Sequence, residues 1–422
     1  MFVGLVKSLL CRMGCHLLKM NQITIGFWNL QNLFDTNATD IASDFEFTPQ
    51  RGWTKEVLNI KLENLAKVIK SIDSNGPDIL GLCEIENESL VRRLIDKIGR
   101  DDYEVASYKD SPDIRGIDTC LIYSTTIFDC LDTISRNVHF RYPTRDIFQA
   151  HLRVKANNAE IDVIVSHWPS RRGKRESCDP NDTEYSRCMV AENCGKIIDN
   201  LLKIPGGELN FLPDDFLQNQ EILERINQSW NRNILLMGDL NDEPFDKSVT
   251  RYLGATSNVR LLREWKEILE LGRHIDGRDK KADKQHYLEY PASLYNCMWR
   301  LLPDGAHYYW GSNNLCMFDQ FIISRGLYFG IQKLKMNLES IKIIKNGLTF
   351  EENLSQDKFD PQDLERAHPA LKVGPMPFEY YRMYKDKNNN PHVNERSIPR
   401  WREPNTGYSD HFPIQGTIDI VD

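Results

Sequence analysis

The chain has 422 residues, of which 41% are apolar and 10% aromatic, and its formal net charge is −8 at pH 7. This composition is that of a globular protein with ample material for a core. The acidic balance gives no sign of a broad basic surface for non-specific nucleic-acid binding, so any recognition of phosphate has to be local.

The N-terminal segment, residues 1–19, contains an apolar stretch that Arg12 interrupts after a few positions. Such a stretch makes a poor signal sequence and is far too short to span a bilayer. We therefore expect residues 1–19 to be an extension outside the fold, and we expect no transmembrane segment. Residues 20–422 show no repeat or clear boundary, and we interpret them as a single domain, assumed to be monomeric.

The ten cysteines lack the close, regular spacing of a disulfide framework. Several lie in or beside apolar runs, where small buried thiols are common. A reducing, cytoplasmic compartment is the simpler interpretation. A secreted or periplasmic location is the alternative, because the even count still permits disulfides.

The first half of the chain alternates short apolar runs with stretches of helical spacing, which predicts strands separated by helices. Strands are expected over residues 23–28, 78–83, 103–107, 119–123, 147–154 and 161–165. Helices are expected over residues 54–69, 90–98 and 188–202. Thr54 is a suitable N-cap for the first of these helices.

A strong strand signal lies at residues 234–237, where four consecutive apolar residues are followed by Gly238 and Asp239. Because side chains alternate along extended chain, Asp239 and Asn241 can point the same way at the end of this strand. Two polar segments, near residues 205–232 and 375–407, are predicted to be insertions. Further strands are expected after Asp319 and at the C-terminus.

Polar residues mark the ends of several predicted strands. Four strands end in Asn29, in Glu84, in His167, and in Asp239 with Asn241. Two later strands instead begin after Asp319 and after Asp410 and His411. If the later strands run antiparallel to the earlier ones, all these side chains reach one edge of a mixed sheet system, as in a layered α/β fold.

The chemistry of this set is selective. Four of its members are carboxylates, which are hard oxygen donors, and no cluster of cysteine or histidine typical of structural zinc is present, so Mg²⁺ or Mn²⁺ is favoured. Converging carboxylates repel one another unless a cation neutralises them. The two histidines add groups that move protons near neutral pH. Together these features indicate metal-assisted hydrolysis of a phosphate ester.

Six segments resemble, in this order, the motifs of the endonuclease/exonuclease/phosphatase superfamily. They are residues 27–34 (FWNLQNLF), 83–87 (CEIEN), 166–171 (SHWPSR), 238–241 (GDLN), 318–320 (FDQ) and 409–411 (SDH). The superfamily includes pancreatic deoxyribonuclease, the exonuclease III-type abasic-site endonucleases, inositol-polyphosphate 5-phosphatases and neutral sphingomyelinases. The resemblance implies a four-layer α/β sandwich of the deoxyribonuclease I type, with two mixed β-sheets packed face to face and helices outside.

The resemblance also implies roles for the residues of the motifs. Glu84 would be the principal metal ligand, with Asn29 and Asp410 nearby. Asp239 and Asn241 would align the attacking water and the phosphate, and Asp319 would orient His411. His411 would act as general base or transition-state stabiliser and His167 as the leaving-group acid, although the two assignments can be reversed.

Three further residues are expected around this set. Asp118, in a strand-edge position, would orient His167. Arg145 stands where the nuclease branch has a phosphate-contacting arginine. Arg171, which follows His167 closely, would contact phosphate or else be a solvated surface charge.

His167 favours the nuclease branch, and we expect a phosphodiester hydrolase acting on nucleic acid, as an endonuclease or exonuclease. The chain departs from the 5-phosphatases around Asp319, and from the abasic-site enzymes after Glu84. The alternative is a phosphatase or phospholipase C-like hydrolase of a small phosphoester or lipid head group. A catalytically silent binding protein is the third hypothesis, which the intact motifs disfavour.

Overall fold

The computed structural model describes residues 21–422 except 38–45, 74, 114, 141–143, 172–181, 205–207, 209–217, 277–286, 310, 354–368, 386–390 and 394–403. The expected extension at residues 1–19 therefore lies outside the described residues, as do parts of the two expected insertions. Within the described parts of those insertions lie one helix, α6 (Gln220–Trp230), and one hairpin, β15 (Met383–Lys385) with β16 (Pro391–Val393).

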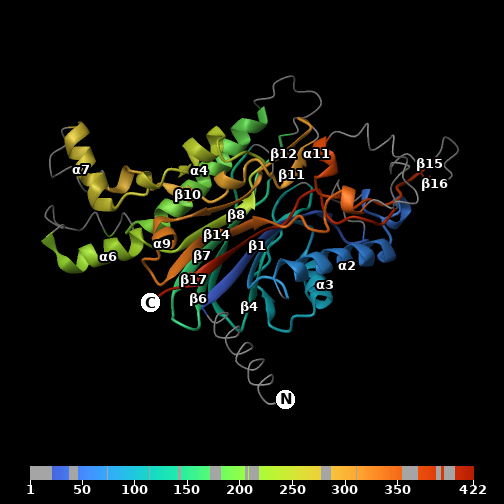
Figure 1. The fold of residues 1–422 in the computed structure, drawn as a ribbon, viewed down its shortest axis with the longest axis horizontal. Helices are drawn as coiled ribbons and strands as arrows, with labels where there is room; N and C mark the ends of the chain where they lie inside the picture. Colours follow the sequence, from blue (N-terminus) through green and yellow to red (C-terminus); the bar gives the residue numbers. More distant parts are fainter. Residues whose placement is uncertain are drawn as a thin grey trace, which may run out of the picture.

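Two large mixed β-sheets form the centre of the molecule (Figure 1). The first sheet has the order β14 (Leu334–Ile343), β17 (Ile414–Ile420), β1 (Gln22–Leu33), β2 (Ile79–Ile85), β4 (Asp118–Ser124) and β3 (Tyr103–Val105). The second has the order β5 (Phe128–Arg136), β6 (Ile147–Val154), β7 (Glu160–His167), β8 (Ile234–Asp239), β13 (Asp319–Ile323), β10 (Leu294–Asn296) and β9 (Ala255–Thr256). A separate hairpin joins β11 (His307–Tyr309) to β12 (Asn314–Cys316).

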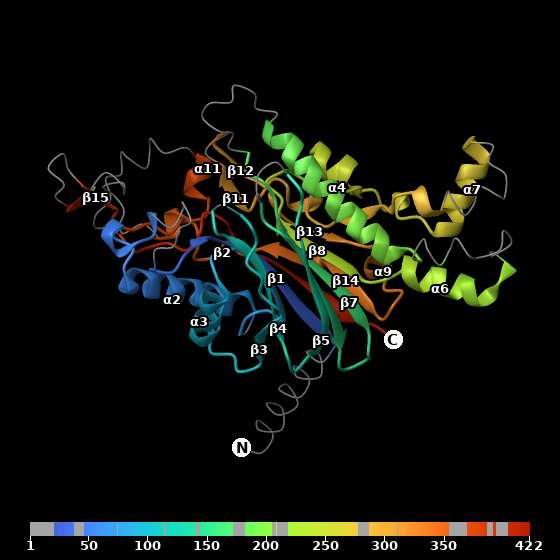
Figure 2. The same ribbon diagram turned by 180° about the vertical axis from the view of Figure 1, so that it is seen from behind.

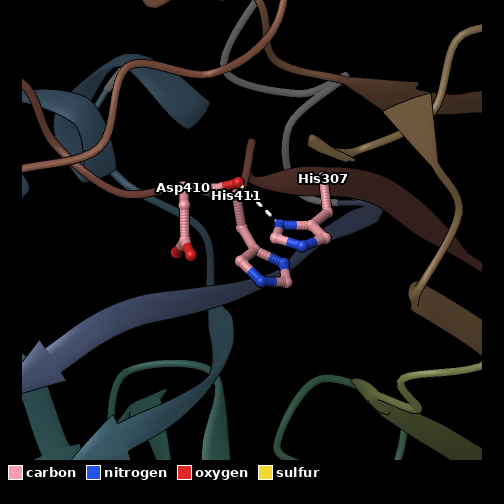
Figure 3. Close-up of side chains that lie close together, drawn as sticks. All are labelled: His307, Asp410 and His411. Atoms are coloured by element: carbon pink, nitrogen blue, oxygen red, sulfur yellow. Dashed lines mark hydrogen bonds between the residues drawn. The ribbon is translucent and has the colours of Figure 1, made fainter. Parts of the chain in front are cut away.

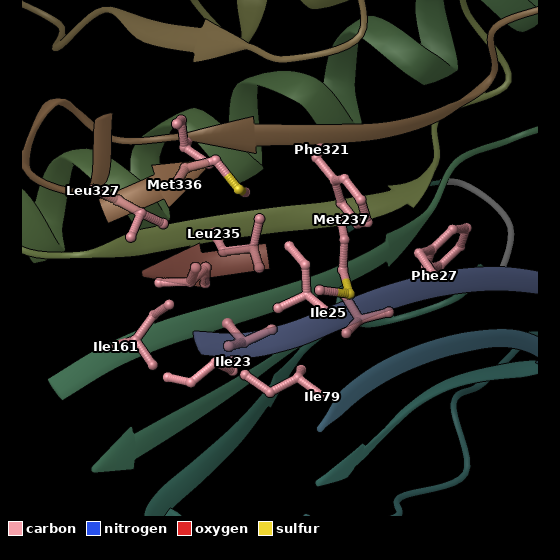
Figure 4. Close-up of a cluster of buried hydrophobic side chains, with 14 of the residues drawn as sticks. Ile23, Ile25, Phe27, Ile79, Ile161, Leu235, Met237, Phe321, Leu327 and Met336 are labelled. Carbon is pink, nitrogen blue, oxygen red and sulfur yellow. The ribbon is translucent and has the colours of Figure 1, made fainter. Parts of the chain in front are cut away.

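The two sheets pack face to face through one apolar core (Figure 4). Alternate residues of β1, Ile23 and Ile25, meet Leu235 and Met237 of β8 there, as the two-residue period of a strand requires. A Cβ atom on Gly81 of β2 would collide with the sulfur of Met237. Glycine at this position therefore permits the close approach of the sheets.

Helices cover the outer faces and complete four layers (Figures 1 and 2). The first sheet is covered by α2 (Lys55–Ile72) and α3 (Glu88–Ile98), and the second by α4 (Asp182–Leu202), α6 and α7 (Trp265–Asp276). Thr54 caps α2 as predicted, since its side chain accepts a hydrogen bond from the amide of Val57. Short helices are α9 (Arg325–Phe329), α11 (Pro369–Lys372) and single turns at Pro49–Arg51, Ser248–Tyr252, Val259–Leu261, Trp299–Leu301 and Glu351–Asn353.

The strand directions confirm the predicted α/β fold with its shared edge. β1 runs parallel to β2, and β7 runs parallel to β8, whereas β17 and β13 run antiparallel to β1 and β8. In this register both His167 and Asp319 pair with Asp239. We call the place where these strand ends meet the active edge. Among the described helices, none combines the length and apolarity needed to cross a membrane.

Candidate active site

Left-handed backbone conformations cluster at the active edge. Gln31, Asn32, Glu84 and Asn241 have φ angles of 52°, 57°, 63° and 50°. Such angles cost roughly 1–3 kcal/mol in residues other than glycine and persist where surrounding contacts hold them, often at functional sites. The pairing of β1 with β2 shifts its register here. The resulting bulge aims the amide of Asn32 at Oε2 of Glu84, 2.8 Å away.

Asp239 lies at the centre of the site, buried at the end of β8. Its Oδ2 accepts a hydrogen bond from Nδ2 of Asn29, and its Oδ1 accepts one from the amide of Asn241, both at 3.0 Å. The Nε2 atoms of His167 and His411 lie 3.6 and 3.7 Å from the same Oδ2. Burial raises the pKa of Asp239 to about 7. Asp239 thus contacts side chains from both sheets, Asn29 of the first and His167 of the second.

His411 is held by Asp319, as expected. Its Nδ1 lies 2.7 Å from Oδ2 of Asp319, which is fully buried at the start of β13. Since a carboxylate accepts, Nδ1 carries the proton and Nε2 faces Asp239. Burial alone would lower the pKa of His411, but the charges of Asp319 and Asp239 outweigh burial and raise it to about 10.

His167 has the opposite electrostatic setting. Burial lowers its pKa well below the usual histidine value, and the nearby charges of Arg145, Arg115 and His411 lower it further. Its Nε2 lies 3.9 Å from Oε1 of Glu84. A neutral His167 beside a protonated His411 favours the reverse of the expected assignment, with His411 as the proton donor.

The predicted contact between Asp118 and His167 is wrong. Asp118 accepts hydrogen bonds from the hydroxyl of Tyr108 and the amide of Ser111, each at 3.0 Å. The Nδ1 atom of His167 is buried and has no hydrogen-bond partner in the structure. Asp118 begins β4, on the first sheet, and its carboxylate is used to fix the loop that precedes that strand.

Arg145 is also placed differently from the prediction of a phosphate contact. Its buried guanidinium pairs with Asp113 at 3.2 Å and donates to the backbone carbonyls of His167 and Trp168 at 3.4 and 2.8 Å. These contacts make Arg145 a support for the segment that carries His167. The side chain of Asn241 donates to the same carbonyl of Trp168, at 3.0 Å.

Arg171 is anchored to the loop after β8. It donates to the carbonyl of Asn241 at 2.8 Å and pairs with Asp242 and Asp246. Its guanidinium also lies 4.7 Å from the ring centroid of Phe318. Arg171 therefore holds the Asp239 loop in place, and its predicted contact with phosphate stays a prediction.

The sequence of this region matches a known family. Residues 24–207, which include Asn29, Glu84 and His167, match the model of the Endonuclease/Exonuclease/phosphatase family. The match covers less than half of the chain. The resemblance predicted from the motifs is thereby confirmed over this part of the chain, which contains the first three of the six motifs.

Solved structures of this superfamily align with the chain at low identity. An endonuclease/exonuclease/phosphatase family protein from Bacteroides thetaiotaomicron has 11% identity and a TM-score of 0.44, with 94% of this chain and 98% of that chain covered. A mannosyl-6-phosphatase from the same species has 12% identity and a TM-score of 0.43, covering 94% and 99%. Truncated TDP2 from Caenorhabditis elegans has 13% identity and a TM-score of 0.43, covering 94% and 97%. No curated protein sequence matches the chain.

Enzymes of the endonuclease/exonuclease/phosphatase superfamily generally depend on a divalent metal, and the donor set fits a hard cation. Oε1 of Glu84 lies at the end of the bulged β2, 3.9 Å from Nε2 of His167 and 4.0 Å from Nη2 of Arg115. The charges of Glu84 and Asp410 both raise the pKa of Lys61, so both carboxylates lie within electrostatic reach of that ammonium. Asn29 already links its amide to Asp239 and to the backbone of Gln31. Glu84 and Asp410, with Asn29 beside them, would hold the metal.

Two residues that border the site were missed by the sequence interpretation because neither belongs to a motif of the superfamily. Lys61 is buried on α2 and donates to the carbonyls of Gln31 and Asn32. The sequence did carry a signal for it, since Lys61 falls on the apolar face of its helix. Arg115 donates to Oδ1 of Asn32 at 2.9 Å and has a side chain that is 39% exposed. No sequence signal distinguished Arg115 from an ordinary surface arginine.

His307, Asp410 and His411 each offer an atom that could bind a metal, and these atoms lie within 4.8 Å of one another (Figure 3). The Nδ1 atoms of the two histidines are already used by Asp319 and by the backbone of Asp410. The two imidazole rings are stacked, 4.0 Å apart and inclined by 21°. The lone pair of an imidazole nitrogen lies in the plane of its ring. In two stacked rings these lone pairs therefore point in nearly parallel planes and do not converge on one ion. This arrangement fits packing better than shared coordination of one ion.

Proposed function

We propose that the chain is a divalent-metal-dependent phosphodiesterase that acts on nucleic acid. The observation that carries this proposal is the placement of two histidine Nε2 atoms within 3.7 Å of one buried carboxylate oxygen, that of Asp239. One imidazole is fixed by Asp319 and the other lies beside Glu84. A phosphate held against Asp239 would meet one imidazole on its attacking side and the other on its leaving side.

Each residue of the site has its own role in hydrolysis. Asp239 and Asn241 align water and phosphate, with the backbone of Asn241 held by Asp239 itself. His411 presents its Nε2–H to the oxygen on which charge develops, because Asp319 fixes the opposite ring nitrogen. When bound at Glu84 and Asp410, the metal supplies Lewis-acid neutralisation of the phosphate charge. Nucleic acid is favoured as substrate by the presence of His167 and by the exposed guanidinium of Arg115 beside Glu84.

A substrate screen tests this proposal. Plasmid DNA, single-stranded DNA and RNA are compared with sphingomyelin, inositol phosphates and a sugar phosphate at fixed salt, with Mg²⁺, with Mn²⁺ and with EDTA. Cleavage of a nucleic acid that needs the metal supports the proposal. Turnover of a lipid or sugar phosphate with intact nucleic acid would reverse it in favour of the small-phosphoester alternative.

Variants of the central residues control for contaminating nucleases. Asp239→Ala and His411→Ala should remove nearly all activity while the melting temperature stays close to that of the wild type, because Asp239 and His411 lie at the edge of the core and not within it. Glu88→Ala, on the exposed face of α3, should keep full activity. Activity retained in both Asp239→Ala and His411→Ala would show that the site lies elsewhere.

A further inference from the structure

His307 lies behind the proposed active site, at the start of β11, and is almost fully buried. Its ring stacks on the ring of His411 with a centroid separation of 4.0 Å. Its ring centroid also lies 5.5 Å from that of Phe318, with an angle of 31° between the ring planes. Phe318 immediately precedes Asp319, the residue that holds Nδ1 of His411.

The imidazole of His411 is therefore restrained in two independent ways. The hydrogen bond from its Nδ1 to Asp319 fixes one edge of the ring and leaves rotation about that bond. The stacked ring of His307 covers one face and opposes this rotation. Figure 3 shows the two rings lying one over the other. Nε2 of His411, which faces Asp239, is thus fixed by an edge contact and a face contact together.

His307 also fixes the backbone that carries the site. Its Nδ1 lies 2.8 Å from the backbone oxygen of Asp410, and because a carbonyl can only accept, Nδ1 is the donor. His307 and His411 pair as an isolated antiparallel bridge, and the amide of Phe412 donates to the carbonyl of Ala306 at 2.7 Å. The β11 segment is thereby tied to the short stretch that holds both Asp410 and His411.

We propose that His307 is a positioning residue for phosphoester hydrolysis, which orients His411 through its ring face and the Asp410 backbone through its Nδ1–H. This inference rests on the proposed function of the site, because it assigns a role within that chemistry. His307 itself does not touch the reacting atoms in this proposal. Its effect is to keep Nε2 of His411 at the place where the phosphate is bound.

Three substitutions separate the two contacts. His307→Phe keeps an aromatic face but removes the donor, whereas His307→Asn keeps a donor near the position of Nδ1 but removes the ring. His307→Ala removes both. A control is His151→Ala, which removes a less deeply buried histidine from β6, outside the active edge.

Kinetics on bis(4-nitrophenyl) phosphate with saturating Mn²⁺ provide the first measurement. His307→Ala should lower kcat by roughly 10- to 100-fold, the size of effect expected from a misplaced catalytic group, with KM within twofold of the wild type. His307→Phe and His307→Asn should each fall between His307→Ala and the wild type, and His151→Ala should match the wild type. A kcat for His307→Ala within twofold of the wild type overturns the proposal. So does a loss of activity in His307→Ala that higher Mn²⁺ concentrations restore, because that result would make His307 a metal ligand.

A second measurement does not depend on activity. In protein labelled with ¹⁵N-histidine, the Nδ1–H resonance of His411 is identified by its loss in His411→Asn. It should shift or broaden in His307→Ala and stay unchanged in His151→Ala. If the wild type hydrolyses no phosphodiester, the proposed function fails but the resonance still tests the contact. An unchanged resonance in His307→Ala refutes the positioning role whatever the substrate proves to be.

Discussion

Arg115 places an accessible positive charge beside Glu84. Its Nη2 lies 4.0 Å from Oε1 of Glu84, and its side chain is 39% exposed. We predict that Arg115→Gln raises KM about tenfold, equivalent to about 1.4 kcal/mol, with little change in kcat, because the guanidinium would contact a substrate phosphate equally in the ground and transition states. Steady-state kinetics at low and high salt check this. Arg92→Gln, which removes an exposed arginine from α3, is the control, and an equal KM effect there would make the charge effect non-specific.

The residues of the site differ in how far the sequence could predict them. Asp239, Asp319 and His411 could be found because each interrupts or borders an apolar run, and strand geometry then brings them together. The tertiary partners of Arg145 and Asp118 could not be found in that way. Whether a guanidinium meets phosphate or a backbone carbonyl depends on loop conformation, and Asp113, which holds Arg145, lies in a loop with no periodic pattern.

At the scale of the element, α2 carries a buried lysine into the active edge. Burial lowers the pKa of Lys61 to about 7, yet its ammonium holds the carbonyls of Gln31 and Asn32, whose backbones are left-handed. We predict that Lys61→Met keeps the free energy of unfolding at pH 7 within about 1 kcal/mol, because relief from burying a charge offsets the lost hydrogen bonds. Because the Asn32 amide that holds Glu84 is then less well fixed, kcat should fall about tenfold.

Urea unfolding and kcat, measured on the same preparation, test the prediction for Lys61. Lys67→Met is a matched control, because Lys67 lies on the exposed face of the same helix. It should change neither quantity. A large loss of stability in Lys61→Met, with kcat per folded molecule unchanged, would show that Lys61 serves the core and not the site.

The pairing of β6 with β7 contains a histidine whose effect on stability depends on pH. The hydrogen bond to Asp162 raises the pKa of His151, and the charge of Glu160 adds to this, although burial and Arg232 act against it. Because the pKa of His151 is higher in the folded state, its protonated form stabilises the fold. This stabilisation is fully present below the unfolded-state pKa of about 6.5 and is lost as pH rises through the folded-state pKa.

His151→Gln should therefore lower the free energy of unfolding more at pH 6 than at pH 8.5, by about 1 kcal/mol. Urea denaturation at both pH values measures this difference. Because His151 lies outside the active edge, kcat should stay at the wild-type level. An equal loss of stability at both pH values would indicate that packing, and not the charge on His151, stabilises this strand pair.

At the scale of the whole molecule, the order of the strands depends on pairings between distant segments. β1 pairs with β17 across almost the whole chain, and such closure is not encoded in any local pattern. The long apolar strands were nevertheless predicted, because one or both faces of each strand are buried and the sequence there is correspondingly apolar. β5 was not, since Phe128 is its only buried residue and polar side chains interrupt its apolar ones, and β9 and β10 are too short to give a periodic signal.

Both sheets contribute acids to the active edge, and we therefore predict that a bound metal stabilises the whole sandwich. Glu84 comes from the first sheet, while Asp239 and Asp319 come from the second, and burial raises the pKa of both aspartates. A cation bound at Glu84 would neutralise charge at the seam between the sheets and would bind the folded chain only. At a metal concentration of 100 times Kd, the folded state should gain about 2.7 kcal/mol.

Thermal or urea unfolding with Mg²⁺ or Mn²⁺ against EDTA measures this gain. Glu84→Gln should abolish the metal-dependent increase, because it removes the charge that attracts the cation but keeps the shape of the side chain. Glu88→Gln, four residues further on and on the exposed surface, should keep the increase in full. If Glu84→Gln and the wild type gain the same stability from the metal, the ion binds elsewhere, and the bulge that turns Glu84 toward His167 must serve the substrate directly.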